Sequence, residues 1–275
     1  MTQAKVSKGT VITLIISILW LLPLLLILNN SFKSDSDILN HFLEFPKTLD
    51  LQYYVDTWTK FNFPHLIINT LLYTVISVIG VIIFAPMAAY YLERHKKQRH
   101  IRICFGLIIL PIMVPFQSYM ITLTRILGKT HLSNTKTGYI IVTVGLLMPL
   151  AVYMIHGFVN TIPIELEESA YIDGAGKLQT YFVIILPLLV PILTTVVVLD
   201  ALSTWNDVIV NQLLIGSNQE AVNMQNALYM QFSAQSSDWS HALPGTVMSM
   251  LPSLIFFIFM QKYIVSGVTA GAVKG

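Results

Sequence analysis

Charge is what this chain has least of. Lys, Arg, Asp and Glu make up 11% of its 275 residues, while 55% are hydrophobic. A soluble domain usually carries about 25% charged residues, so a chain this poor in charge cannot cover itself with a water-compatible surface. The sequence therefore predicts a protein whose solvent is largely lipid.

Residues that build disulfides, metal sites and nucleotide sites are also scarce. Cys104 is the single cysteine, which excludes an intramolecular disulfide. A net charge of +2 is too small to suggest nucleic acid, and no His/Cys cluster suggests a metal. Gly176-Lys177 resembles part of a phosphate loop, but Leu178 replaces the required Ser or Thr and Tyr171 replaces the first glycine. We expect no enzyme and no cofactor.

What the chain does have is a series of long charge-free windows. A helix needs about 20 apolar residues to cross the hydrocarbon layer, and lipid leaves no partners for free backbone groups, so the crossings must be helices. The first window follows Lys5 and Lys8 and is interpreted as an uncleaved span. The sequence predicts an all-α membrane protein with six spans, at about 11–29, 67–91, 104–124, 138–158, 181–202 and 242–262.

The positions of Lys and Arg predict the orientation. With the N-terminus inside, ten of the basic residues fall in cytoplasmic segments and six fall outside, and the run Glu93–Arg102 makes most of the difference. The outer loop Trp205–Asp238 has no Lys or Arg. Both termini are therefore expected in the cytoplasm. Prolines recur inside the predicted spans, where they break helical hydrogen bonds and favour kinks.

The loop between the fourth and fifth predicted spans is the most informative segment. Pro163 suits the first turn of a helix, and Gly174 and Gly176 suit its end. Three glutamates lie near the positive end of the helix dipole, at Glu165, Glu167 and Glu168. A short acidic helix at about 163–173 is expected. Residue patterns alone leave two roles open, a mechanical lever and a helix lying on the membrane.

A motif in this loop favours the lever. Glu168-Ser169-Ala170 is followed by Gly174, then by Ile184 and Leu186-Pro187. This spacing resembles the signature of ATP-binding-cassette (ABC) importer permeases, with serine in place of the first alanine. The resemblance implies a type I ABC importer permease fold in which the 163–173 helix couples the bundle to an ATPase. The coupling residues it implies are Glu167, Glu168, Ser169, Ala170, Asp173 and Gly174.

The resemblance extends over nearly the whole chain and is strongest to the carbohydrate branch, of the maltose-transporter type. Asn69-Thr70-Leu71 opens the second predicted span, and Trp205-Asn206-Asp207 follows the fifth. By resemblance, the loop after the fifth span reaches a solute-binding protein. The cytoplasmic tail 265–275 would contact the ATPases through Gly271, Lys274 and Gly275. Trp205, Asn206, Asp207, Asp200 and Asn69 are expected at the binding-protein contact or along the solute path, although helix–helix hydrogen bonding is an open alternative for the polar residues within spans.

The resemblance implies a permease subunit in a bacterial cell membrane that imports a sugar or oligosaccharide by alternating access. Its implied partners are a second homologous permease, two ATPase subunits and an extracytoplasmic solute-binding protein. Two rivals remain open. An ion-coupled secondary transporter predicts a mid-span carboxylate and inverted repeats, and a membrane scaffold predicts no need for an ATPase.

Overall fold

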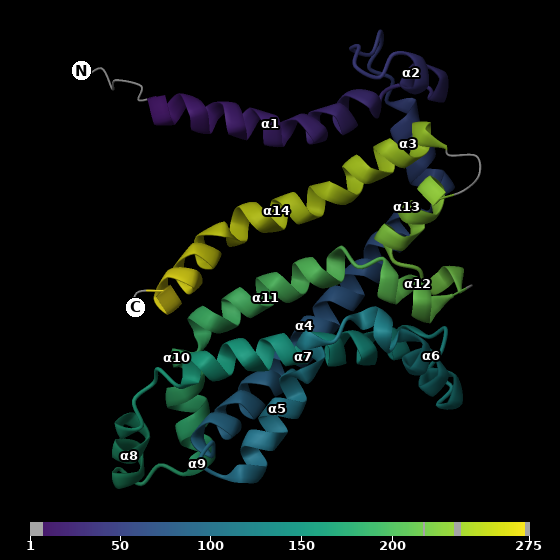
Figure 1. Ribbon diagram of the computed structural model, residues 1–275. Coiled ribbons are helices and arrows are strands. Elements are labelled where there is room, and N and C mark those ends of the chain that lie inside the picture. The colour runs from purple at the N-terminus through teal and green to yellow at the C-terminus, as the bar shows by residue number, and fades with distance from the viewer. Residues whose placement is uncertain (1–7, 217, 234–237, 273–275) are drawn as a thin grey trace. The chain divides into compact units, whose positions relative to one another are not determined.

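The computed structural model describes residues 8–216, 218–233 and 238–272, which form helices joined by turns (Figure 1). Among them, four helices are long and apolar enough to cross a membrane, and a bent helix pair makes up to a fifth. The four are α1 (Lys8–Asn30), α4 (Phe63–Arg94), α7 (Lys136–Val159) and α14 (Trp239–Ala272). The chain divides into two compact units, residues 1–66 with 227–252 and residues 67–226 with 253–275.

Shorter helices connect the long ones. They are α2 (Asp35–Asn40), α3 (Gln52–Lys60), α5 (Arg99–Met113), α6 (Met120–Lys129), α8 (Glu165–Ile172), α12 (Ile209–Ile215) and α13 (Met224–Ser233). Single 3₁₀ turns lie at η1 (Phe116–Ser118) and η3 (Gln219–Ala221).

Proline interrupts two of the predicted spans. The range 104–124 divides among α5, η1 and α6, because Pro115 holds the preceding Val114 in an extended conformation (φ −99°, ψ 118°) that ends α5. The range 181–202 begins in the π-helical η2 (Thr180–Ile185), which follows α9 (Lys177–Gln179), and continues into α10 (Leu186–Leu188). It then bends by 69° into α11 (Val190–Trp205). Pro187 and Pro191 flank this bend and each removes a helical donor.

The second unit has a continuous packed core built by α4, α5, α7 and the η2–α11 segment. Small residues let the helices approach closely, since Ala85, Ala89 and Ala151 are all nearly inaccessible. A Cβ on Gly80 of α4 would lie 3.1 Å from Cγ2 of Val144 on α7. In lipid, such close contact replaces hydrophobic burial as the force that holds helices together.

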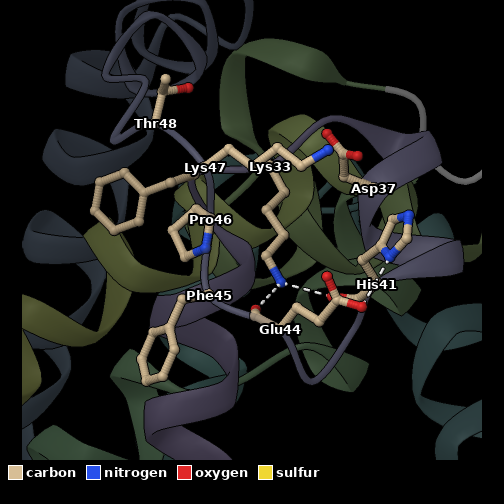
Figure 2. A pocket seen from close by; sticks show the side chains of 9 residues that line it. Lys33, Asp37, His41, Glu44, Phe45, Pro46, Lys47 and Thr48 are labelled. Atoms are coloured by element: carbon tan, nitrogen blue, oxygen red, sulfur yellow. Dashed lines mark hydrogen bonds and ion pairs between the residues drawn. The ribbon is translucent and has the colours of Figure 1, made fainter.

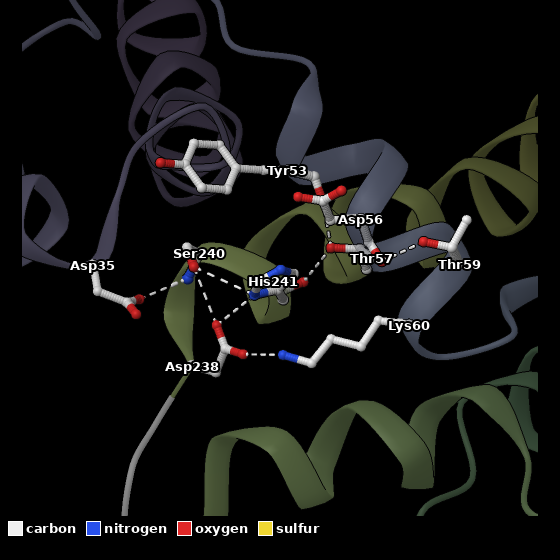
Figure 3. Close-up of polar contacts among 9 residues, drawn as sticks. All are labelled: Asp35, Tyr53, Asp56, Thr57, Thr59, Lys60, Asp238, Ser240 and His241. Atoms are coloured by element: carbon white, nitrogen blue, oxygen red, sulfur yellow. Dashed lines mark hydrogen bonds and ion pairs between the residues drawn. The ribbon is translucent and has the colours of Figure 1, made fainter.

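In the first unit, a polar cluster joins α3 to the start of α14 (Figure 3). Asp238 accepts hydrogen bonds from Lys60 Nζ at 2.6 Å and pairs with His241 Nδ1 at 2.6 Å. The backbone N–H of Ser240 donates to Asp35 Oδ1 at 2.8 Å, which adds α2 to the cluster. Burial alone would raise the pKa of Asp238, but the hydrogen bonds from Lys60 and His241 outweigh it and lower the pKa to about 2. The Asp238 carboxylate therefore stays charged and links α3 to the start of α14.

Candidate functional site: the α8 helix and the loop after α11

The short acidic helix is α8, Glu165–Ile172, and a glycine ends it. Gly174 has φ +85°, a left-handed conformation that costs residues with a Cβ roughly 1–2 kcal/mol. Two backbone bonds close the end of the helix, Ala175 N to Ala170 O at 2.9 Å and Gly174 N to Tyr171 O at 3.1 Å. This is the Schellman arrangement, in which a left-handed residue just past the helix lets orphan carbonyls find donors. Gly176, by contrast, adopts an ordinary extended conformation (φ −76°).

Glu167 fixes α8 to the last turns of α4. Its Oε1 accepts from Arg94 Nε at 2.6 Å, and its Oε2 accepts from Tyr90 Oη at 2.5 Å. A second Arg94 nitrogen donates to the carbonyl of Ile162 at 3.1 Å, just before α8. The side chains of Arg94 and Glu167 are only 13% and 6% exposed. Charge-assisted hydrogen bonds at this burial are strong and directional, so α8 has a defined position against α4.

The residue before Arg94 binds a different helix. Glu93 is buried and pairs with His156 Nε2 of α7 at 2.9 Å and with Lys96. Phe105 of α5 stacks on the His156 ring with centroids 4.1 Å apart, and Lys96 also donates to Asn160 at 2.7 Å. The final turn of α4 is thus bound to both α7 and α8, and the His156 ring in turn packs on α5.

The faces of α8 differ sharply. Glu167 and Ala170, three residues apart, are buried against the unit, while Glu165, Glu168 and Ser169 are exposed. Ile172 is 86% exposed despite its apolar side chain. Beside the helix lies an open groove of about 500 Å³. Its walls include Met87, Tyr90, Arg94, Tyr171, Lys177 and Tyr181. An acidic face with small and apolar side chains, next to a groove, suits contact with another protein.

The loop after α11 is organised by Asp207. Its Oδ2 accepts from Tyr139 Oη at 2.8 Å and from Asn211 N at 2.9 Å, and its Oδ1 accepts from Val210 N at 3.1 Å. Burial raises the pKa of Asp207, although these three hydrogen bonds oppose that shift. Trp205 is buried and Asn206 is exposed. Asp207 therefore caps the start of α12 and ties it to α7.

Asn69 holds the far end of the same loop. Its Nδ2 donates to the carbonyls of Glu220 and Val222, both at 2.9 Å, and its Oδ1 accepts from Lys136 Nζ at 2.7 Å. Further bonds to the loop come from Tyr73 Oη to Ala221 O at 2.7 Å, from Met224 N to Thr70 Oγ1 at 2.9 Å, and among the buried Asn211, Asn223 and Asn226. Asn69 and Asp207 thus belong to one hydrogen-bonded scaffold.

The remaining predicted site residues lie apart from these two networks. Asp200 is 3% exposed within α11, and its Oδ2 has no hydrogen-bond partner among the described residues. Gly271 falls within the bounds of α14, whereas Lys274 and Gly275 lie outside the described residues. In the described part of the chain, no group of three His, Cys, Asp or Glu residues could hold a metal ion.

Residues 82–269 match the model of the family described as binding-protein-dependent transport system inner membrane component. The chain belongs to this family. It is 34% identical to a probable starch degradation products transport system permease protein, AmyC, of Thermoanaerobacterium thermosulfurigenes, with 96% of each chain covered. It is 33% identical to the multiple sugar-binding transport system permease protein MsmG of Streptococcus mutans, covering 94% of this chain and 93% of the other. The resemblance to importer permeases is confirmed.

Solved structures of the same fold support the architecture. A chain of a bacterial ABC transporter involved in the import of the acidic polysaccharide alginate superposes with a TM-score of 0.79, at 23% identity, covering 95% of this permease and 99% of that chain. A second alginate transporter structure, in complex with an alginate pentasaccharide-bound periplasmic protein, gives a TM-score of 0.64 at 14% identity. Those structures cover 95% and 90% of this chain, so nearly all of it follows the permease fold.

Sequence reasoning treated the acidic residues of α8 as one group and missed the basic and aromatic residues that bind one of them. Arg94 entered only as a charge that sets orientation, and Tyr90, Lys136 and Tyr139 were not singled out. The spacing of the residues was an available signal. Glu167 and the small Ala170 are three residues apart and share a helix face. Glu168, by contrast, lies beside Ser169, so Glu167 was the glutamate placed to face the protein.

Proposed function

We propose that this family member is one permease subunit of an ATP-driven importer for a sugar or oligosaccharide, in a bacterial cell membrane. Several relatives carry names of sugar and oligosaccharide permeases, which supports a carbohydrate substrate. The proposed topology has six crossings, formed by α1, α4, α5 with α6, α7, the α9–α11 segment and α14, with both termini in the cytoplasm. The excess of Lys and Arg on the α8 side supports that orientation.

The assembly we propose has a second, homologous permease, two ATPase subunits and an extracytoplasmic solute-binding protein. The failed phosphate-loop match at Tyr171 and Leu178 favours hydrolysis on a separate subunit. A related fold has been solved with a periplasmic protein that carries an oligosaccharide, which supports the binding-protein partner.

In the proposed mechanism, α8 is the coupling helix, and the observation that carries it is the Glu167–Arg94 pair at 2.6 Å. A lever must be stiffly attached at one end and exposed at the other. Glu167 and Ala170 attach α8 to the end of α4, while Glu168, Ser169 and Asp173 stay exposed for the ATPase. Closure of the ATPases would move α8, and α4, as a rigid helix of 32 residues, would carry that movement into the membrane.

The other predicted contacts take more specific roles in this proposal. Gly271, Lys274 and Gly275 reach the ATPases. Asn206, exposed at the end of α11, faces the binding protein, and Trp205, Asp207 and Asn69 hold the loop that presents it. Asp200, a buried carboxylate without a hydrogen-bond partner in the described residues, faces the solute path in one of the alternating states.

Reconstituted vesicles test the proposal. The chain, copurified with its partners, is expected to take up a labelled oligosaccharide only with ATP inside and the binding protein outside. A cysteine at position 169, in a Cys104→Ser background, is expected to crosslink to the ATPase, and one at Ser36, an exposed residue of α2, is not. Uptake driven by an ion gradient without ATP would favour a secondary transporter. Failure of position 169 to crosslink in an active assembly would refute the coupling role.

A further inference from the structure

Polar contacts fasten the loop 41–46 to the end of α1 and to Lys33, whose contacts Figure 2 shows. The buried Lys33 ammonium donates to the carbonyls of His41 at 2.9 Å and Glu44 at 2.5 Å. Two asparagines at the end of α1 add to this, with Asn30 Nδ2 donating to Phe42 O at 3.0 Å and Asn29 Nδ2 donating to Glu44 O at 2.8 Å. The loop backbone therefore lies within hydrogen-bond reach of the last turn of α1.

That attachment sets the depth of the loop if α1 crosses the membrane. The 23 residues of α1 form a rod of about 34 Å at 1.5 Å per residue, and the hydrocarbon layer is about 30 Å thick. Asn29 and Asn30, at the C-terminal end, then lie at the boundary between hydrocarbon and headgroups. Backbone atoms bonded to those two side chains must lie at the same level.

The side chains that this loop exposes are large and apolar. Phe42, Leu43 and Phe45 are 46%, 78% and 89% exposed. In water such a cluster would be costly, whereas Phe and Leu are typical of interfacial segments that bury an apolar face at the boundary between headgroups and acyl chains. The loop carbonyls at 42 and 44 already have donors, so entering a region with less water would leave neither without a partner.

The charged residues of the loop are compatible with the same depth. Glu44 pairs with His41 Nδ1 at 3.0 Å (Figure 2), so its carboxylate has a partner within the loop. Lys47, two residues after Phe45, is exposed. A lysine beside apolar side chains at this level can reach lipid phosphates while its stem lies along the acyl chains.

We propose that residues 42–45 form an interfacial anchor, which inserts Phe42, Leu43 and Phe45 into the lipid layer around the C-terminal end of α1. The occupant of this apolar surface is lipid, because the hydrogen bonds to Asn29, Asn30 and Lys33 hold it at the rim of a membrane-crossing helix. The anchor would fix the outer end of α1 relative to the bilayer while the rest of the permease changes conformation. This inference rests on the proposed function only in requiring that α1 spans the membrane.

Site-directed spin labelling of the full chain, with its copurified partners in lipid nanodiscs, tests the anchor. Single cysteines are placed at Phe45 and Leu43 in a Cys104→Ser background. The matched references are Leu19, 61% exposed in α1, and Ser36, an exposed polar residue of α2. At each position, the rate at which the spin label collides with oxygen, which concentrates in lipid, is compared with the rate at which it collides with a water-soluble nickel chelate. We expect labels at 43 and 45 to favour oxygen, as at 19, and the label at 36 to favour nickel.

Each other outcome overturns the anchor. Nickel access at 45 with oxygen access at 19 would place the loop in water and leave α1 as a span, so the proposed function would stand. Nickel access at 19 as well would show that α1 does not cross, so the anchor and the proposed six-crossing topology would both fail. An immobile label at 45 that neither reagent reaches would mean that protein, rather than lipid, covers the surface.

Discussion

Replacing Arg94 with methionine is the sharpest test of how α8 is held. The substitution keeps an unbranched apolar stem but leaves the Glu167 carboxylate 6% exposed, with Tyr90 as its remaining donor. Removing one partner of a buried ion pair typically costs about 3–5 kcal/mol, because the other charge stays buried without compensation. Since the Arg94 side chain is itself 13% exposed, the lower end of that range applies here.

The expected consequence is local. Each 1.4 kcal/mol corresponds to a tenfold change in an equilibrium constant, so about 3 kcal/mol would raise the population of undocked α8 by up to about 100-fold. Hydrogen exchange measures this directly, as a loss of protection of the α8 backbone amides of similar size. In the reconstituted transporter, the ratio of solute imported to ATP hydrolysed should fall, while the chain still inserts into the membrane.

Matched variants separate attachment from simple charge loss. Lys97→Met removes an exposed cation next to the same helix end, and Glu165→Gln removes an exposed anion from α8, and neither should change protection because exposed pairs contribute little. The double variant Arg94→Met with Glu167→Gln should recover much of the lost protection, since it removes the uncompensated charge. Unchanged exchange and coupling in Arg94→Met alone would refute the attachment.

Three further perturbations follow from the geometry. Gly174→Leu should cost about 1–2 kcal/mol at φ +85° although a Cβ there meets open space, and should lower coupling, whereas Gly176→Leu, equally open but at φ −76°, is the control that should keep it. Asn69→Leu removes three hydrogen bonds, each contributing about 1 kcal/mol, and should speed proteolysis of the segment 218–223. Equal rates of cleavage in the variant and the wild type would show that other contacts hold this segment. Because the folded pKa of Asp238, about 2, lies below the ordinary aspartate value of 3.8, its stabilisation is complete above about pH 4 and is lost as the pH falls toward 2. Thermal unfolding should show this step in the wild type and not in Asp238→Asn.

The sequence predicted the long helices because lipid imposes a simple pattern. A charge-free run of about 20 residues has few alternatives to a helix, so α1, α4, α7 and α14 follow from composition. The two interrupted segments depend on finer detail. Kinks were expected from proline, but the break after Met113 and the 69° bend before α11 arise where prolines meet particular neighbours and the core geometry. Charge counting carries no information on such packing.

The candidate site was predicted in the same uneven way. The position of α8 and its glycine end came from local signals, a cluster of glutamates and Gly174, and the left-handed conformation agrees with that reading. The partners of Glu167 and Asn69 could not be predicted from local signals, because they lie 67 to 153 residues away in the sequence. Local patterns fix which residues form a helix, but distant pairing depends on how the helices pack.

Two consecutive residues at the end of α4 explain why α8 suits a lever. Glu93 is bound to α7 through His156, and Arg94 is bound to α8 through Glu167. Neighbouring helix residues point about 100° apart, so the last turn of α4 contacts α7 and α8 on different sides. A force on α8 therefore reaches α4 through the buried Arg94–Glu167 ion pair and reaches α7 through the buried Glu93–His156 contact. Weakening the Glu93–His156 pair should accordingly lower the ratio of solute imported to ATP hydrolysed, while hydrogen exchange of the α8 amides stays unchanged.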